Sequence, residues 1–335
     1  MKPTRIIVIG LGQWGNLWID NIQSDPNFEL VALVDSDKDK VEQACVKFNI
    51  NKKIGFTDLH KGLAATTPDA ALVIVPPRFH YPVAMTCIEN HLSVLSEKPL
   101  ANSMEEALRL KQASEEHETL FMVSQDYRWQ PPIQTLRDLI AKGVIGKPGY
   151  ATYRHFQKLI IGGWREAMKD VIVEDMVIHH FDILRYITGL DCQEVFTDSF
   201  NPAWSWYAGG AATSIILRFQ ENFHVNYFAT WVTSGREDSW PGEILIEGEK
   251  GSLTLTAKGS VRLIANGKVR TVPQPAMLRT GRAYALAQFH NGITNHIMPD
   301  SSISDNIKSY AMVCAALTSV KESKLIRVAD LLVQS

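Results

Sequence analysis

The first third of the chain alternates short apolar runs with stretches of helical periodicity. Buried strands are predicted at residues 5–10, 29–35, 70–75, 92–95 and 120–124, and helices at 13–23, 38–48, 80–90 and 103–116. Such alternation is typical of a doubly wound α/β fold with a parallel sheet.

The pattern changes after Pro131-Pro132. A helix is predicted at 131–142, ending at Gly143, with further helices at 174–188, 282–297 and 304–322. Residues 148–157 and 193–274 hold alternating, β-branched or aromatic runs separated by turn signals, as at Asn266-Gly267. This pattern of short strands and turns predicts a large, mostly antiparallel open sheet in a second, α+β region.

The first strand runs directly into a glycine-rich turn. Gly10, Gly12 and Gly15 form G-x-G-x-x-G, and a second strand, 29–35, ends at Asp35 about twenty residues further on. Gly10 allows a tight turn, Gly12 lets the backbone approach a pyrophosphate, and Gly15 lets the helix pack closely. The helix N-terminus offers N–H groups to phosphates, and Asp35 offers acceptors to the hydroxyls of an adenosine ribose. We therefore predict an N-terminal Rossmann domain over 1–125 and a C-terminal substrate-binding and oligomerisation domain over 126–335.

Composition narrows the class of protein. A length of 335 residues favours two domains over one core, and a formal net charge of −2 gives no reason to expect nucleic acid or a membrane as partner. The four cysteines are widely spaced and form no C-x-x-C pair, so we expect neither a disulfide framework nor a metal site. No apolar run approaches the roughly 20 residues of a membrane span, and the first strand begins close to Met1, so we expect a cytoplasmic protein.

Several motifs identify a family resemblance. A strand ending in Glu97-Lys98-Pro99, downstream of the glycine turn, resembles the glucose–fructose oxidoreductase / inositol dehydrogenase / MocA (Gfo/Idh/MocA) family. Residues 127–131, 145–148, 175–182 and 248–253 resemble further motifs of that family, the third being its Asp-x-x-x-His-x-x-Asp signature. The likeness covers nearly the whole chain.

The resemblance implies an NAD(P)-binding oxidoreductase and supplies further cofactor-binding candidates. Added to the three glycines and Asp35, these are Gln13, Trp14, Ser36, Pro76, His80, Glu97 and Lys98. Two departures matter: Val75 and Pro77 replace a Thr and an Asn of the family, and residues 171–174 replace glycines that border the substrate. The identity of the substrate therefore cannot be inferred from that of well-known members of the family.

Oxidation of an alcohol by hydride transfer needs a base for the hydroxyl proton and a donor for the oxygen. Asp175 and His179 are spaced i, i+4, which predicts one face of one helix. We assign His179 as general base, Asp175 as its modulator and a possible acceptor for a substrate hydroxyl, and Lys98 as the donor that positions the oxygen. The family has the same roles at matching positions. Asp182, at i+7, is interpreted as a hydrogen-bond anchor.

Other polar and aromatic residues fall in segments that the family places near substrate. Trp129 and Trp164 are candidates for stacking on a sugar face, although most tryptophans are simply core residues. Arg154, His155 and Arg165 are candidates for contact with a polar or anionic substituent. His180 is interpreted mainly as structural, with a reserve role as base or substrate contact.

The leading functional prediction is an NAD(P)-dependent dehydrogenase that acts on a ring hydroxyl of a sugar, cyclitol or derivative (CH–OH donors). The alternatives are a non-catalytic, dinucleotide-binding regulator and an enzyme that reduces C=N or C=C bonds, as relatives of biliverdin reductase do. The presence of Lys98, Asp175 and His179 counts against the regulator, and the pair of Asp175 and His179 counts against the reductase. We expect NAD to be preferred because Asp35 would repel a 2′-phosphate, although Ser36 and Lys38 leave NADP possible. Large apolar residues at Phe219, Phe223, Tyr227, Phe228 and Trp231 predict a homodimer or homotetramer through the sheet.

Overall fold

The computed structural model describes residues 2–333 and divides into two compact units. The first comprises the chain up to Asp126 together with Arg279–Ile307, and the second comprises Tyr127–Leu278 with the residues from Lys308 on. The chain thus returns to the first unit late in the sequence. The division into one domain over residues 1–125 and another over residues 126–335 stays a prediction.

The first unit is built on a six-stranded, entirely parallel sheet in the order β3-β2-β1-β4-β5-β6. Its strands are β1 (Thr4–Ile9), β2 (Phe28–Val34), β3 (Gly55–Phe56), β4 (Ala70–Val73), β5 (Ser93–Ser96) and β6 (Phe121–Val123). This is the strand order of a dinucleotide-binding Rossmann fold, whose ligands sit at the carboxyl ends of the strands near the point where the order reverses, between β1 and β4.

Helices connect these strands, because parallel neighbours need crossovers. They are α1 (Gln13–Gln23), α2 (Lys38–Lys47), α3 (Leu59–Thr66), α4 (His80–Glu89) and α5 (Met104–Glu116). The sequence patterns placed these strands and helices to within about three residues, but missed β3 and α3, which are short and weakly patterned.

The late return of the chain completes the first unit. Helix α8 (Gly281–Asn295) packs on α1, and Thr4 on β1 hydrogen-bonds to the His290 ring across 2.9 Å. After α8, the backbone of Ser301 and Ser302 pairs with the otherwise open edge of β6, where the Ser301 hydroxyl donates to the Val123 carbonyl at 2.7 Å. An unpaired sheet edge is thereby covered.

The second unit holds a nine-stranded sheet in the order β14-β13-β12-β11-β7-β10-β9-β8-β15. Every neighbouring pair is antiparallel except β7 with β10. The strands are β7 (Pro148–Phe156), β8 (Cys192–Phe200), β9 (Ala212–Phe219), β10 (His224–Thr230), β11 (Glu243–Gly248), β12 (Gly251–Leu255), β13 (Val261–Ala265), β14 (Lys268–Val272) and β15 (Ile326–Arg327). The predicted α/β domain followed by an α+β domain with a large, mostly antiparallel sheet is confirmed.

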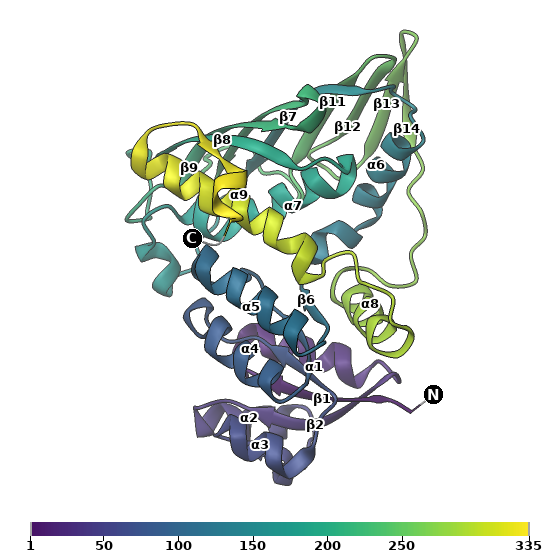
Figure 1. Cartoon of the computed structure of the whole chain (residues 1–335). Coiled ribbons are helices and arrows are strands. Elements are labelled where there is room, and N and C mark those ends of the chain that lie inside the picture. Colours follow the sequence, from purple (N-terminus) through teal and green to yellow (C-terminus); the bar gives the residue numbers. More distant parts are fainter. Residues whose placement is uncertain (1, 334–335) are drawn as a thin grey trace. The chain divides into compact units, whose positions relative to one another are not determined.

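Helices α6 (Pro131–Ala141), α7 (Val177–Thr188) and α9 (Ile303–Glu322, whose first residues belong to the first unit) lie against one face of this sheet (Figure 1). Side chains alternate accordingly: on β10, Val225 and Tyr227 point to the helices while His224 and Asn226 are exposed.

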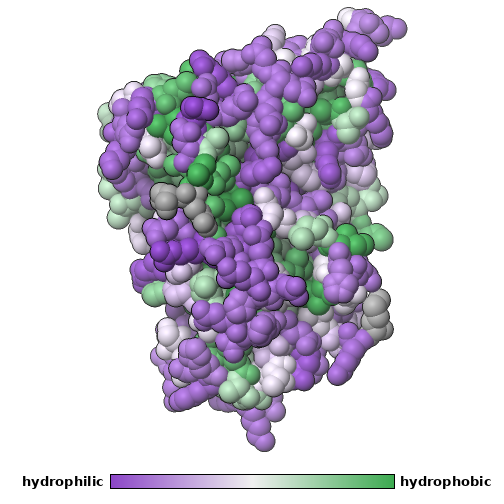
Figure 2. Space-filling view, in the orientation of Figure 1, coloured by the Kyte–Doolittle hydropathy of each residue, from purple (hydrophilic) through white to green (hydrophobic). Residues whose placement is uncertain are grey.

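The aromatic residues used to predict self-association lie mostly on the covered face. Phe219, Phe223, Tyr227 and Trp231 are each at most 2% exposed, and only Phe228, of these five, lies half-buried on the open face. The argument from those four residues is therefore wrong, because they are buried within the chain itself. On the face seen in Figure 2, hydrophilic residues dominate and apolar ones gather in separate small groups. The homodimer or homotetramer stays a prediction.

Within residues 2–333, no helix combines the length and the apolar composition that a membrane crossing requires.

Candidate active site

The glycine turn of the first unit is shaped by close backbone contacts. Gly10 has φ +100°, and a Cβ there would lie 2.2 Å from the Ile74 carbonyl oxygen on the neighbouring crossover. A Cβ on Gly15 would lie 2.1 Å from the Gly10 carbonyl oxygen. Gly12, in contrast, faces open space, and a Cβ at that position would have no neighbouring atom within 4 Å. The turn is thus packed on two sides and open on the side where a ligand would approach.

Helix α1 begins at this turn with unsatisfied donors. Its N-cap, Gly12, has no side chain to accept from the first N–H groups, and the first turn contains no acidic residue. Gln13 and Trp14 are exposed at the first two helical positions. A helix start of this kind binds phosphate through backbone N–H groups and the positive end of the helix dipole.

The Asp35 carboxylate is oriented by the same turn. One oxygen accepts from the Leu11 backbone N–H at 2.8 Å, and the other accepts from the N–H of Asp37 at 3.0 Å. Each oxygen keeps a lone pair for a ribose hydroxyl. Ser36 is exposed beside it. The open glycine, the uncapped helix and the oriented acid all fit a dinucleotide.

The ends of β4 and β5 are tied together by buried polar contacts. The His80 ring lies between the Val75 carbonyl oxygen (2.9 Å) and the Pro99 carbonyl oxygen (2.6 Å), and burial lowers the pKa of this histidine. Because His80 is almost fully buried, it has no surface for direct contact with a cofactor, contrary to expectation; it positions the loops on either side, including exposed Pro76.

Glu97 and Lys98 follow β5 and are both half-buried. The Glu97 carboxylate accepts from the indole N–H of Trp18 at 2.7 Å and from the backbone N–H of Lys98 at 3.3 Å. Nearby Asp126, which the sequence reasoning missed, has its pKa raised to about 6, first by burial and then by the charge of Glu97. A strand end followed by an acid, as at residues 121–126, is the signal that would have found it.

Asp175 belongs to the second unit and precedes helix α7. It lies in a π-helical turn, Ile172–Met176, and α7 starts only at Val177. The expectation that Asp175 and His179 share one regular α-helix is therefore wrong in this detail. The Asp175 carboxylate accepts a hydrogen bond from Nε of Arg165 at 2.8 Å. Single π-turns are frequent at functional sites because they reorient side chains.

His179 lies on the first turn of α7 and is 8% exposed. Its ring stacks on that of Tyr127, with centroids 4.4 Å apart and planes inclined by 28°. A stacked, largely buried imidazole has few rotamers available, so its orientation is fixed before any substrate binds.

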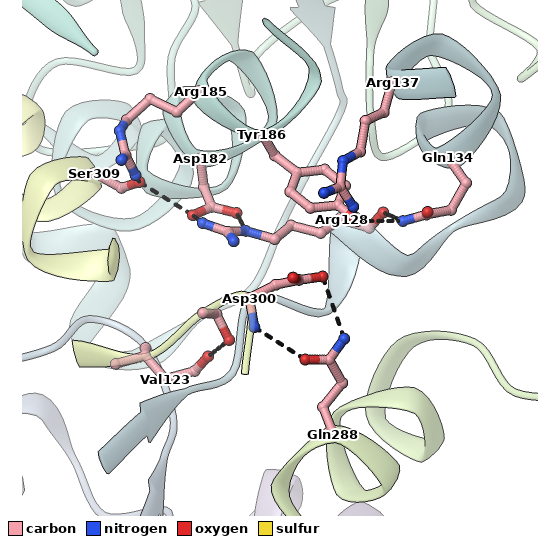
Figure 3. A network of polar contacts seen from close by, with 11 residues as sticks. Val123, Arg128, Gln134, Arg137, Asp182, Arg185, Tyr186, Gln288, Asp300 and Ser309 are labelled. Atoms are coloured by element: carbon pink, nitrogen blue, oxygen red, sulfur yellow. Dashed lines mark hydrogen bonds and ion pairs between the residues drawn. The ribbon is translucent and has the colours of Figure 1, made fainter. Parts of the chain in front are cut away.

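The position of α7 is fixed by a buried ion pair one turn further on. Asp182 accepts two hydrogen bonds at 2.5 Å from the guanidinium of Arg128, and both side chains are at most 2% exposed (Figure 3). Ser309 donates to Asp182 at 3.1 Å and accepts from Arg185 at 2.9 Å. The interpretation of Asp182 as an anchor is confirmed by this network. The role of Arg128 was missed, although its place beside Tyr127 in a family motif was visible.

The other side of the Arg128 guanidinium faces an aromatic ring. Its carbon lies 5.1 Å from the centroid of Tyr186, and Arg137 stacks on the same ring at 4.2 Å. Gln134 donates both to the Arg128 carbonyl (2.9 Å) and to the Tyr186 hydroxyl (2.8 Å). The ion pair is therefore enclosed by partners that leave it little freedom.

Several candidates for substrate contact lie elsewhere. Trp129 is fully buried in the core and has no face for a sugar. Arg154 points to the open face of the sheet, opposite α7, where it pairs with Glu243. These two expectations are wrong, because the sequence pattern does not show which face of a strand or turn meets the core.

The two buried histidines beside the sheet are also structural. His180 is fully buried, with Nδ1 2.7 Å from the Tyr227 hydroxyl, and burial holds its pKa well below the usual range. The His155 ring lies 4.8 Å from it, and burial lowers its pKa to about 4. Neither imidazole has surface for a substrate, so the reserve role for His180 is not supported.

Trp164 remains a candidate. It is 52% exposed, and the guanidinium of Arg165 stacks on its ring at 4.5 Å. Because Arg165 also holds Asp175, this pair joins an exposed aromatic surface to a predicted site residue. No group of three or more His, Cys, Asp or Glu side chains within residues 2–333 is arranged to hold a metal ion.

Comparison with known families decides the identity. Residues 4–125 match the model of an oxidoreductase family with an NAD-binding Rossmann fold, and residues 133–254 match the GFO/IDH/MocA C-terminal domain. The chain belongs to the GFO/IDH/MocA oxidoreductase family. The predicted resemblance is confirmed, and residues 4–125 match the NAD-binding Rossmann domain of such an oxidoreductase.

Relatives in this family include named dehydrogenases. D-apiose dehydrogenase of Paraburkholderia graminis is 24% identical over 99% of this chain and 91% of its own length. Myo-inositol 2-dehydrogenase of Thermotoga maritima is 26% identical, over 58% of each chain. Among solved structures, an Agrobacterium radiobacter oxidoreductase in complex with NAD+, L-tartaric acid and magnesium superposes with a TM-score of 0.91 at 18% identity, covering 99% of this chain and all of that one. At that identity the likeness shows the shared fold.

The buried ion pair yields a stability prediction. Asp182→Asn leaves the Arg128 charge buried without its carboxylate, so we expect the free energy of unfolding to fall by about 3–5 kcal/mol. Urea unfolding followed by tryptophan fluorescence measures this. The exposed pair of Glu194 with Arg218 is the control: Glu194→Gln should cost less than about 1 kcal/mol. Equal effects of the two substitutions would contradict the anchoring role of Asp182.

Proposed function

We propose that this protein is an NAD-dependent dehydrogenase that transfers a hydride between the carbon of a ring hydroxyl, in a sugar, cyclitol or derivative, and the nicotinamide. The observation that carries the proposal is the His179 imidazole, stacked on Tyr127 and held on an anchored helix, in a chain of an NAD-binding oxidoreductase family. An imidazole fixed in this way is suited to general base catalysis.

In the proposed reaction, the substrate hydroxyl gives its proton to His179 while the carbinol carbon loses a hydride and becomes a carbonyl. NAD, which the glycine turn and Asp35 would hold, would supply the acceptor for that hydride. The Lys98 ammonium donates a hydrogen bond to the reacting oxygen, where negative charge builds up in the transition state. Asp175, held by Arg165, tunes the imidazole and accepts from a neighbouring substrate hydroxyl.

Names of relatives support a polyol substrate. Myo-inositol 2-dehydrogenase, D-apiose dehydrogenase and scyllo-inositol 2-dehydrogenase (NAD+) of Bacillus subtilis all have names that refer to polyhydroxy compounds. Exposed Trp164 is suited to the apolar face of such a ring. Nothing in the described part of the chain favours a regulator without catalytic activity.

The test is a panel of cyclitols, aldoses and their acids with NAD+, followed by the absorbance of reduced nicotinamide. We expect at least one class to be oxidised by the wild type. His179→Ala should lower turnover on that substrate by about two to four orders of magnitude, the usual contribution of general acid–base catalysis. Its affinity for NAD+ should be unchanged, because His179 does not belong to the NAD-binding unit.

His224→Ala is the matched control, since this histidine is exposed on the open face of the same unit and should leave turnover unchanged. Turnover of His179→Ala near that of the wild type would remove His179 from the mechanism. If the wild type binds NAD+ but oxidises no compound of the panel, the non-catalytic alternative gains support.

A second expectation concerns the choice between NAD and NADP. The carboxylates of Asp35, Asp37 and Asp39 follow β2 and would repel a 2′-phosphate. Lys38, the lysine nearest to Asp35 in sequence, has its ammonium 3.6 Å from the carboxylate of Glu42 and is partly neutralised by it. We therefore expect kcat/KM with NAD+ to exceed that with NADP+ by about tenfold or more. Asp35→Ser should reduce this ratio, and equal or better efficiency of the wild type with NADP+ would show the argument to be wrong.

We further propose that the protein is cytoplasmic and assembles as a homodimer or homotetramer. Tyr150 (58% exposed) and Ile216 (45% exposed) on the open face of the large sheet are the residues that favour self-association there.

A further inference from the structure

Arg282 lies beside the glycine turn although 270 residues of sequence separate it from Gly12. It is the second residue of α8, and its guanidinium carbon lies 5.0 Å from the ring centroid of Trp14 and 5.8 Å from that of Trp18. Trp14 and Trp18 belong to the first two turns of α1. The late return of the chain thus brings a fixed positive charge to the start of the phosphate-binding helix.

The charge of Arg282 lacks a hydrogen-bonded counter-ion within the described part of the chain. Its Nε is buried without a hydrogen-bond partner, and its guanidinium lies against the two indole rings. Its charge also acts on Asp126, whose pKa it lowers, but no hydrogen bond joins the two side chains. Arg279, one turn earlier, differs: it is paired with the carboxylate of Asp25 and therefore has a structural role. A partly buried guanidinium that packs on aromatic rings and has no hydrogen-bonded acid is suited to an anionic ligand.

The groups around Arg282 favour the same kind of ligand. The N-terminus of α1 has no side-chain cap and no acid in its first turn, and Gly12 faces open space. The helix end carries a partial positive charge, and the guanidinium carries a full one. Together they match a group with two adjacent negative charges and several acceptor oxygens, which is the chemistry of a pyrophosphate.

We propose that Arg282 binds the pyrophosphate of the dinucleotide, with Trp14 holding the plane of its guanidinium. The proposal rests on the dinucleotide-binding part of the proposed function. It adds a residue outside both regions that match the family models, residues 4–125 and 133–254. Two N–H groups of a guanidinium can donate to two phosphate oxygens at once while the flat side of the guanidinium stays stacked on the indole ring.

The test is calorimetric titration of the full-length protein with NAD+, NADP+ and ADP-ribose. Arg282→Gln should weaken binding of all three by about ten- to hundredfold, because all contain the pyrophosphate. The loss should shrink at high ionic strength, where the charge is screened. Arg282→Lys keeps the charge without the planar guanidinium and should give an intermediate loss.

Arg109→Gln is the matched control, since it removes the same charge from an exposed site on α5 of the same unit and should leave all three affinities unchanged. Melting temperatures without ligand separate binding from folding, and Arg282→Gln should stay within about 4 °C of the wild type. A large fall in the melting temperature of Arg282→Gln would instead indicate that Arg282 only packs on the tryptophans. The Arg282→Lys variant would then decide between the two roles. If this variant is stable and its affinities are unchanged, the proposed contact between the guanidinium and the pyrophosphate is wrong.

Other outcomes overturn the proposal in distinct ways. Unchanged affinity of a folded Arg282→Gln protein removes Arg282 from the site. A loss confined to NADP+ assigns Arg282 to the 2′-phosphate, and a loss confined to the two nicotinamide-containing ligands assigns it to the nicotinamide end. Failure of the wild type to bind any of the three ligands contradicts the proposed function itself, which is a different result.

Discussion

The second unit depends on the buried pair of Arg128 and Asp182. Asp182 lies one turn after His179, and Arg128 directly follows Tyr127, whose ring stacks on His179. The pair therefore fixes α7 and the stacking partner of the imidazole with one interaction. A buried ion pair is a poor source of net stability, but its strict demand for complete hydrogen bonding makes it an effective positioning device. Here every partner that it needs is present.

The two units use charge in opposite ways. In the second unit, Arg128, Asp175 and Asp182 have partners that hold them in place, which is the rigidity that the proposed roles of Asp175 and His179 require. In the first unit, the helix N-terminus and Arg282 present positive charge without a hydrogen-bonded acid at Gly12, where the backbone is open. Charges with hydrogen-bonded partners thus accompany the proposed orientation of reacting groups, and charges without hydrogen-bonded partners accompany the proposed binding of the dinucleotide. Asp35 fits this picture because the turn orients its oxygens without neutralising them.

Local patterns predicted most of the fold, because strands buried on both faces and amphipathic helices have strong periodicity. They also predicted the glycine turn, whose sequence is dictated by backbone clashes. The errors share a cause, since the pattern of one segment does not reveal what packs on it. Phe219 and Tyr227 looked available for self-association but are buried within the chain, and Trp129 lies in the core. Arg282 was invisible for the same reason, since only tertiary folding brings α8 to α1.

The most direct test of the proposed hydride transfer follows the hydrogen on the carbinol carbon of the substrate. With the substrate that the protein oxidises, deuterated at the carbon that carries the reacting hydroxyl, mass spectrometry of the reduced dinucleotide follows the label. Hydride transfer predicts one deuterium in the nicotinamide ring for each substrate oxidised, because the hydrogen moves directly from carbon to carbon without exchange with water. Reduced dinucleotide without deuterium, or release of the label to solvent, would contradict the account.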